Sequence, residues 1–337
     1  MRNAFASKKR AGALLGLILG CCALAAPGCL VTSWESPLGR NHPLIGRIWD
    51  VSAARFIDSQ SLVRRLARAD FVLLGERHDN PDHHRLQAEV LRSLIAIGRR
   101  PAVGFEMFGL DDASAIADYL ATARRDAAGL GSAVNWNQRG WPDWAMYQPI
   151  AEAALAARLP IIPTNLPAVT VRKMRSAGLA ALDPRLTRAL GLDQPLPELL
   201  SVALAADIRA FHCGHASEQT VRAMVAVQRA RDAQMAQSLI AAAGADGAVL
   251  VAGSGHVRND YGIPFYIIAK GAGKRVASVA FLEVDEHKTE PRDYALPYRS
   301  GRLPFDYVWF TPRIDDEDPC EKFKSQFERL KRPSGDP

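Results

Sequence analysis

The stretch Phe71-Val-Leu-Leu-Gly-Glu-Arg-His-Asp79 decides the fold. Four apolar residues are closed by a glycine, and polar residues follow at once. A short, wholly apolar run of this kind is typical of a strand that is buried on both faces, as in a parallel sheet. Helical spacing of apolar residues follows from Pro81 to Ile97, and proline suits the first turn of a helix. The segment therefore predicts a buried strand followed by a helix.

The same strand-and-helix unit recurs along the chain. Further strand-like runs stand at 102–106, 159–163, 248–253 and 276–284, and helical patterns stand at 111–120, 145–158 and 218–243. Strands that alternate with helices predict an α/β fold with a largely parallel central sheet flanked by helices. Residues 166–215 hold short helical stretches broken by glycine and proline, and we expect a smaller helical insertion there.

Composition narrows the class of protein. The chain has 337 residues, of which 48% are hydrophobic, enough for one large domain with a core. Of the formal net charge of +6, four units come from the first ten residues, which leaves +2 for the rest. This small charge gives no reason to expect a nucleic-acid partner. No P-loop, dinucleotide-binding or G-x-S-x-G motif stands between a strand and a helix, which argues against the enzyme classes that use them.

The first thirty residues have the pattern of an export signal. Basic residues precede an uncharged apolar run at 11–19, which is shorter than the roughly 20 residues of a membrane-spanning helix. The string Leu17-Ile-Leu-Gly-Cys21 resembles the bacterial lipobox, whose cysteine becomes lipidated, and Cys29 is the alternative acceptor. We expect an exported lipoprotein anchored to a bacterial membrane, with the outer membrane as the expected site. A retained anchor and an ordinary signal peptide are the other interpretations.

The domain division follows from these patterns. We expect a signal peptide at 1–20, a tether at 21–47, the α/β domain at 48–290 and a peripheral C-terminal segment at 291–337. An exported protein permits a disulfide between Cys213 and Cys320, and two free buried thiols are the equal alternative.

Polar groups follow three of the predicted strands. Glu76 and His78 come after the first strand, Glu106 ends the second, and His256 follows the third. Because ligands bind beyond the carboxyl ends of parallel strands, we expect these four side chains to converge at one edge of the sheet. His78, Glu106 and His256 could hold a divalent metal with an open position. Without a metal, glutamate and histidine could act as an acid–base pair.

Other histidines have simpler interpretations. His83 and His84 begin the predicted helix, where we expect them to be capped or solvated. His212 and His215 are one helical turn apart and could ligate a metal or haem iron, although such a pair is more often a polar face. For any one of the strand-end residues taken alone, a hydrogen bond to a neighbouring loop is the ordinary interpretation.

Several motifs together resemble the ChaN family of haem-binding lipoproteins. They stand at Leu73–Gln87, Gly104–Met107, Trp144–Pro149, Asn165–Pro167, Arg231–Ala236 and Ala252–Arg258. The match runs in consistent order over roughly residues 48–285. The resemblance implies an α/β domain with a smaller helical part, and haem binding linked to haem or iron uptake. It also implies haem held cofacially between two subunits, with a tyrosine as the iron ligand.

The resemblance does not place that tyrosine by motif. Tyr147 is the first candidate because it shares a helical face with Trp144, and Tyr261 is the second. The wider group also resembles the Tiki proteases and the erythromycin esterases, in which G-x-x-H motifs and a carboxylate form a hydrolytic site. Those positions correspond here to His78, Glu106 and His256, with Glu76 beside them.

Three functions follow as hypotheses. The first is a membrane-anchored haem-binding lipoprotein that forms a homodimer on haem binding. The second is a metal-dependent hydrolase that acts on an ester or peptide through the His/Glu site. The third is a lipid-anchored scaffold without activity.

Overall fold

The computed structural model describes residues 33–123, 125–271, 273–298, 300–318 and 320–321. The signal segment, with Cys21 and Cys29, lies outside these residues, so lipidation stays a prediction. Trp34 is the first residue of the compact unit that contains the sheet. Within the described ranges, no helix is both long enough and apolar enough to cross a membrane.

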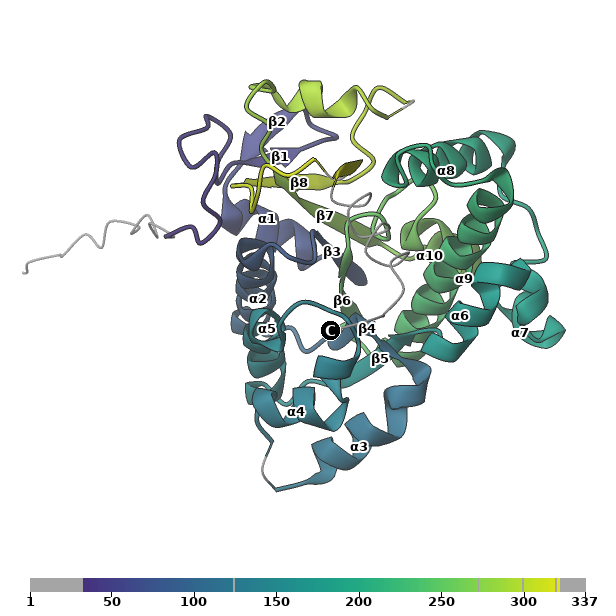
Figure 1. The fold of residues 1–337 in the computed structure, drawn as a ribbon. Coiled ribbons are helices and arrows are strands. Elements are labelled where there is room, and N and C mark those ends of the chain that lie inside the picture. Colours follow the sequence, from purple (N-terminus) through teal and green to yellow (C-terminus); the bar gives the residue numbers. More distant parts are fainter. Residues whose placement is uncertain (1–32, 124, 272, 299, 319, 322–337) are drawn as a thin grey trace, which may run out of the picture. The chain divides into compact units, whose positions relative to one another are not determined.

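The described residues form an eight-stranded sheet with the strand order β2-β1-β8-β7-β3-β6-β4-β5 (Figure 1). The strands are β1 Ile48–Asp50, β2 Arg55–Ile57, β3 Phe71–Glu76, β4 Ala102–Gly109, β5 Ile161–Asn165, β6 Ala248–Gly253, β7 Val276–Glu283 and β8 Tyr307–Thr311. From β8 to β5 every pair of neighbours is parallel, while β1 runs antiparallel to both β8 and β2. The predicted α/β fold with a largely parallel sheet is confirmed.

Helices connect the strands and cover the sheet. They are α1 Ser59–Leu66, α2 Pro81–Ala96, α3 Ala113–Ala121, α4 Ala127–Ala133, α5 Trp144–Ala156, α6 Ala168–Ala177, α7 Pro184–Ala189, α8 Glu198–Phe211, α9 Glu218–Ala242 and α10 Ile263–Lys270. Local chemistry sets where they begin. Asn80 caps α2 by accepting from the N–H of Asp82, and Pro81 occupies the first turn. Helices α6, α7 and α8 lie within the stretch where the sequence predicts a helical insertion.

Alternating strand residues supply two hydrophobic cores, one on each face of the sheet. In β3, Val72 and Leu74 belong to the core shared with α1, α2 and α5. Phe71 and Leu73 belong to the core shared with α9 and α10. Figure 1 shows these two sets of helices on opposite sides of the sheet. This double burial explains why the strands are apolar throughout instead of alternating with polar residues.

Residues 34–47, which the sequence places in the tether, pack on the domain. The backbone N–H of Ser36 donates to Asp82 over 2.9 Å, and that of Gly46 donates to the carbonyl of Phe310 over 3.0 Å. Leu44 is 1% exposed. Proline and glycine give this stretch the composition of a linker, but here they form turns that bring Leu44 into the core.

The C-terminal segment also differs from the prediction of a peripheral location. Strand β8 lies inside the sheet between β7 and β1, and its Val308 and Phe310 side chains are fully buried. A five-residue strand in a turn-rich stretch gives a weak local signal, and one of its two sheet neighbours, β1, is distant in sequence. Nearby, Cys320 is disulfide-bonded to Cys213, so the two thiols are paired and not free.

Candidate functional site

The four predicted strand-end residues meet at the carboxyl edge of the sheet. Parallel pairing sets Glu76 opposite Gly253, so the loops after β3 and β6 leave the sheet side by side. His256 Nε2 lies 3.2 Å from Glu106 Oε1. His78 places Nδ1 2.8 Å from Glu76 Oε1 and Nε2 3.9 Å from Glu106 Oε1. The convergence expected from the sequence is therefore present in the structure.

Glu106 is the centre of this cluster and is 1% exposed. Its Oε1 accepts from the Arg231 guanidinium of α9, and its Oε2 accepts from the backbone N–H of Gly253 over 2.6 Å. Burial alone would raise the pKa of Glu106, but His256, Arg231 and His78 hold it well below its usual range. Glu106 is therefore a carboxylate surrounded by cations.

His256 is held from both sides by acidic residues. Asp232 of α9 bonds its Nδ1, while Glu106 lies at Nε2. Burial would lower the pKa of His256, but the charges of Glu106 and Asp232 outweigh burial and raise it to about 9. Burial raises the pKa of Asp232 as well. At neutral pH this imidazole is thus a proton donor.

A second carboxylate, Glu76, organises the neighbouring cluster. Its Oε1 accepts from the Tyr147 hydroxyl over 2.9 Å, and its Oε2 lies 3.0 Å from Nδ1 of His84. Burial opposes ionisation of Glu76, yet His84 and His78 hold its pKa far below the usual range. The pKa values of both histidines are raised, because these carboxylates outweigh burial.

Three residues of the site were not expected to act there from the sequence: His84, Arg231 and Asp232. His84 was expected at a solvated helix start, but it is fully buried and its ring lies 4.1 Å from the Tyr147 ring. His84 Nε2 lies 2.9 Å from the carbonyl oxygen of His78, so the first turn of α2 packs against the segment that follows β3, which explains this burial. Arg231 and Asp232 belong to the stretch Arg231–Ala236, which resembles a motif of the family. That resemblance was the sequence signal that could have indicated their role in the site.

The predicted metal site has no support in this structure. Within the described part of the chain, no group of three or more His, Cys, Asp or Glu side chains could hold a metal ion. The physical reason is that the donor atoms are engaged. Arg231 already neutralises Glu106, Asp232 takes one nitrogen of His256, and Glu76 takes one nitrogen of His78.

Both candidate haem-ligand tyrosines are buried and bonded to carboxylates. Tyr147 is 0% exposed and donates to Glu76, while Tyr261 is 3% exposed and donates to Asp207. Burial, together with these carboxylates, raises the pKa of each phenol far above its usual value. Either phenol would have to leave its carboxylate to reach an iron, so both stay predictions as ligands.

A cavity of about 580 Å³ opens beside Glu106. Its wall includes Glu106, Met107, Asp111, Asn135, Gln138, Arg139, Trp141, Asn165, Leu166, Ala168, Val171, Arg172, Arg175 and Arg231. The indole of Trp141 meets the His78 ring edge-on, with 5.0 Å between ring centroids. The His78 side chain is 34% exposed. The cavity therefore joins the buried cluster to solvent.

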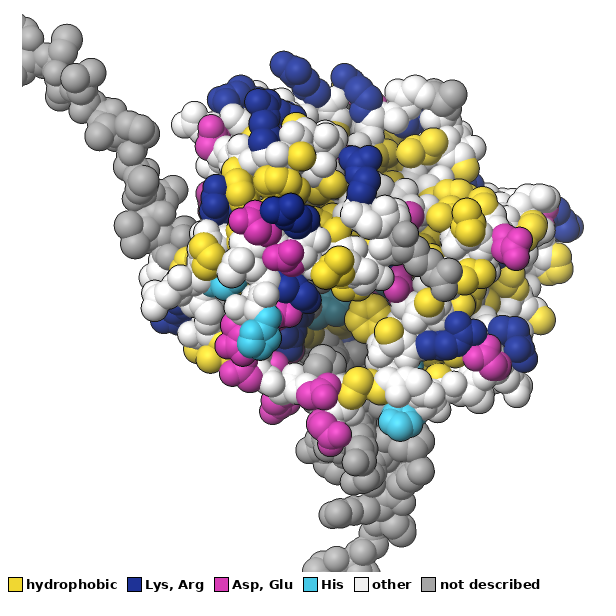
Figure 2. Space-filling view, turned by 90° about the horizontal axis from the view of Figure 1, so that it is seen from above, with side chains coloured by type: hydrophobic (Ala, Val, Ile, Leu, Met, Phe, Trp, Pro, Cys, Tyr) yellow, Lys and Arg dark blue, Asp and Glu magenta, His cyan; other side chains and the backbone are white. Residues whose placement is uncertain are grey.

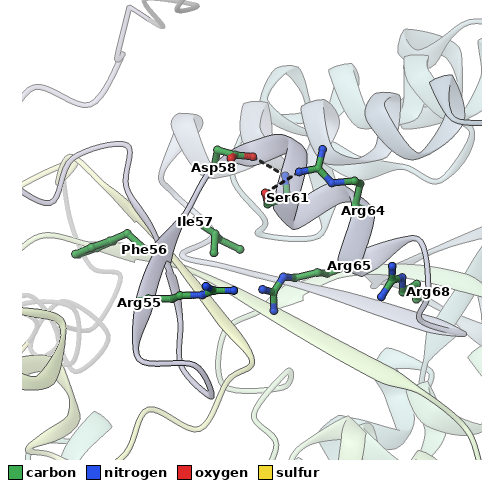
Figure 3. A pocket seen from close by; sticks show the side chains of 8 residues that line it. All are labelled: Arg55, Phe56, Ile57, Asp58, Ser61, Arg64, Arg65 and Arg68. Atoms are coloured by element: carbon green, nitrogen blue, oxygen red, sulfur yellow. Dashed lines mark hydrogen bonds between the residues drawn. The ribbon is translucent and has the colours of Figure 1, made fainter.

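A second cavity of about 620 Å³ lies between β2 and α1. Figure 3 shows Arg55 and Arg65 extending toward one another from these two elements, with Arg68 further along. None of the His or Glu residues of the strand-end cluster lines it. We place the functional site at the cavity beside Glu106, because a hollow of about 580 Å³ there meets the cluster of perturbed groups.

The face of the molecule drawn in Figure 2 carries charges of both signs. Figure 2 shows basic side chains gathered along the upper edge of one face, with acidic, basic and hydrophobic side chains mixed over the rest. This mixture agrees with a modest net charge.

The fold and the site define an α/β protein with buried His–carboxylate pairs beside a cavity rich in arginine. Residues 62–267 match the family described as "Haem-binding uptake, Tiki superfamily, ChaN". The match spans more than half of the chain, and the protein belongs to this family.

One solved structure supports the same fold. The chain is similar to ChaN of Campylobacter jejuni, a protein that binds haem cofacially, with 21% identity over 78% of this chain and 95% of that chain and a TM-score of 0.60. It is also similar to a mutant of the erythromycin esterase EreC in its open conformation, with 12% identity over 77% and 95% of the two chains and a TM-score of 0.42. The TM-score of this second structure is too low to support an argument. A search of curated proteins finds no match.

Proposed function

We propose that this protein binds haem in the cavity beside Glu106 and serves haem or iron uptake as an exported, lipid-anchored protein. The observation that carries the haem proposal is membership of a family of haem-binding proteins, together with a cavity of about 580 Å³ at the sheet edge. Export and anchoring rest on the signal segment and the lipobox-like Cys21.

The cavity wall has apolar and cationic groups that suit the porphyrin ring and its carboxylates. The Trp141 indole offers a flat apolar face, and Met107, Leu166 and Val171 add apolar surface. Small-molecule sites combine such apolar walls with a few polar groups that fix orientation. The polar groups here are largely arginines, which suit a ligand that carries carboxylates.

The iron ligand and the assembly are further parts of this proposal. Tyr147 is the first candidate ligand and Tyr261 the second, each after release from its carboxylate partner. By analogy with the family we propose that two subunits enclose the haem, so that haem binding and dimerisation are linked.

A titration of the full-length protein with hemin tests haem binding. We expect a saturable shift of the Soret band. In Trp141→Ala, which removes the flat wall, we expect weaker binding by about tenfold, the size of one large buried aromatic contact. A spectrum that stays equal to that of free hemin under a several-fold excess of protein would refute the proposal.

One observation favours a second candidate function, hydrolysis without a metal. His256 stands between Asp232 and Glu106, an arrangement that fixes an imidazole as a proton donor beside an ionised carboxylate. Glu106 would accept a proton from water, His256 would donate one to the leaving group, and Arg231 would stabilise negative charge on the attacked carbonyl.

Hydrolysis is tested with the wild-type protein and the His256→Gln variant on a panel of esters and peptides. The candidate predicts turnover by the wild type and a loss of at least about 100-fold in the variant, as expected for a general acid. Equal rates in the two proteins would exclude this role.

A further inference from the structure

One face of helix α6 forms part of the cavity wall. Ala168, Val171, Arg172 and Arg175 all line the cavity, and their spacing of i, i+3, i+4 and i+7 puts them on a single helical face. Ala168 and Val171 have small side chains, so the helix backbone lies close to the cavity, and Arg172 and Arg175 add charge to the wall. The helix thus presents two guanidinium groups to the same hollow.

These two arginines differ from the others in the cavity. Arg139 is paired with Asp112, and Arg231 is paired with Glu106. For Arg172 and Arg175, no ion pair or side-chain hydrogen bond joins them to any residue in the described ranges. Both side chains are exposed. Their charge is therefore available to a ligand.

Charge balance within the cavity points the same way. The acidic residues of the wall are Glu106, which Arg231 and His256 already neutralise, and Asp111. The two positive charges of Arg172 and Arg175 exceed the one remaining negative charge, that of Asp111. The open part of the cavity is therefore positive. Planar guanidinium groups bind carboxylates in a two-pronged geometry, which makes a carboxylate the best matched anion.

The same cavity wall also offers an aromatic and apolar surface, from Trp141, Met107 and Leu166. A ligand that satisfies both the charged and the apolar parts of the wall has a flat apolar body and acidic side arms. We propose that Arg172 and Arg175 bind the propionate carboxylates of haem, so that the cavity selects tetrapyrroles with free carboxylates and fixes their orientation. This inference rests on the proposed haem function.

The test compares hemin with hemin dimethyl ester, whose carboxylates are blocked, by Soret titration of the full-length protein. We expect the wild type to bind hemin at least about tenfold more tightly than the ester, from one or two charge-assisted hydrogen bonds. In the double variant Arg172→Gln/Arg175→Gln, hemin affinity falls to that of the ester, while ester affinity is unchanged. The conservative pair Arg172→Lys/Arg175→Lys keeps charge without the planar fork, and we expect an intermediate affinity for hemin.

Helix α7 offers a matched control. Arg185 and Arg188 have the same i, i+3 spacing, are exposed, and do not line the cavity. Arg185→Gln/Arg188→Gln should bind hemin as the wild type does. The proposal is overturned if this control loses as much affinity as the α6 variant, or if the folded α6 variant still prefers hemin over its ester. If the wild type binds neither hemin nor its ester, the proposed haem function itself is refuted. That outcome is distinguishable from the two results that overturn only the role of Arg172 and Arg175.

Discussion

Nε2 of His256 lies 3.2 Å from Oε1 of Glu106, while Asp232 bonds the opposite nitrogen of the same ring. An imidazole between two buried carboxylates is more stable charged than neutral. The pKa of His256 is therefore raised to about 9, and the imidazole is protonated at neutral pH. This pairing makes the stability of the fold depend on pH.

The first prediction concerns that pH dependence. Because the pKa of His256 rises from 6.5 to about 9 on folding, its stabilisation is fully present below pH 6.5 and is lost as pH rises through 9. The loss is up to about 3 kcal/mol. Urea unfolding measured from pH 6 to 9.5 should show the decline. His256→Gln should flatten it, and the exposed His287→Gln should leave it intact; an equal slope in both variants would contradict this assignment.

The second prediction concerns Glu106. Glu106→Gln leaves Arg231, His256 and His78 facing a neutral amide, and breaking a buried ion pair from one side typically costs about 3–5 kcal/mol. We expect a loss of this size in the free energy of unfolding. The exposed Glu198→Gln serves as the control and should change stability by less than about 1 kcal/mol. A Glu106→Gln protein as stable as this control would show that the cluster is not coupled as described.

The sequence carried enough information to place His78, Glu106 and His256 together. The apolar runs 71–75 and 248–253 mark strands buried on both faces, and parallel strands bring their carboxyl ends to one edge. The polar residues that follow these runs could therefore be placed at that edge of the sheet. The ChaN-like motifs added the family, which the comparison confirms.

Other parts of the site depend on contacts that no local pattern records. Asp232 lies within the long helix α9, where a polar residue gives the same signal whether it faces solvent or a histidine. His84 begins a helix, a position that is usually solvated, and its burial depends on how α2 packs against the segment that follows β3. Strand β8 is short, and it lies between β7, the preceding strand, and β1, which is remote in sequence.

The third prediction separates two roles of Tyr147. Its hydroxyl is buried and donates to Glu76, so Tyr147→Phe should lower the free energy of unfolding by about 1–2 kcal/mol. We also expect the Soret band of the hemin complex to change, because the proposal has the phenol leave Glu76 for the iron. An unchanged band in a folded variant that still binds hemin would exclude Tyr147 as the iron ligand.

The fourth prediction concerns the Cys213–Cys320 disulfide, which joins residues 107 positions apart. The chain-entropy model gives about 4–5 kcal/mol for closing a loop of this length. Reductant should therefore lower the urea midpoint of the wild type. The double variant Cys213→Ser/Cys320→Ser should begin at the lower midpoint and not respond to reductant. A wild-type midpoint insensitive to reductant, with the thiols shown to be reduced, would contradict the prediction.

The central claim is that haem occupies the cavity beside Glu106. Diffraction at the iron absorption edge from crystals grown with hemin measures the position of the iron directly. The account predicts an anomalous peak inside the cavity bounded by Trp141 and α6, with the propionates directed toward Arg172 and Arg175. An iron peak elsewhere on the protein, with this cavity free of tetrapyrrole density, would contradict it.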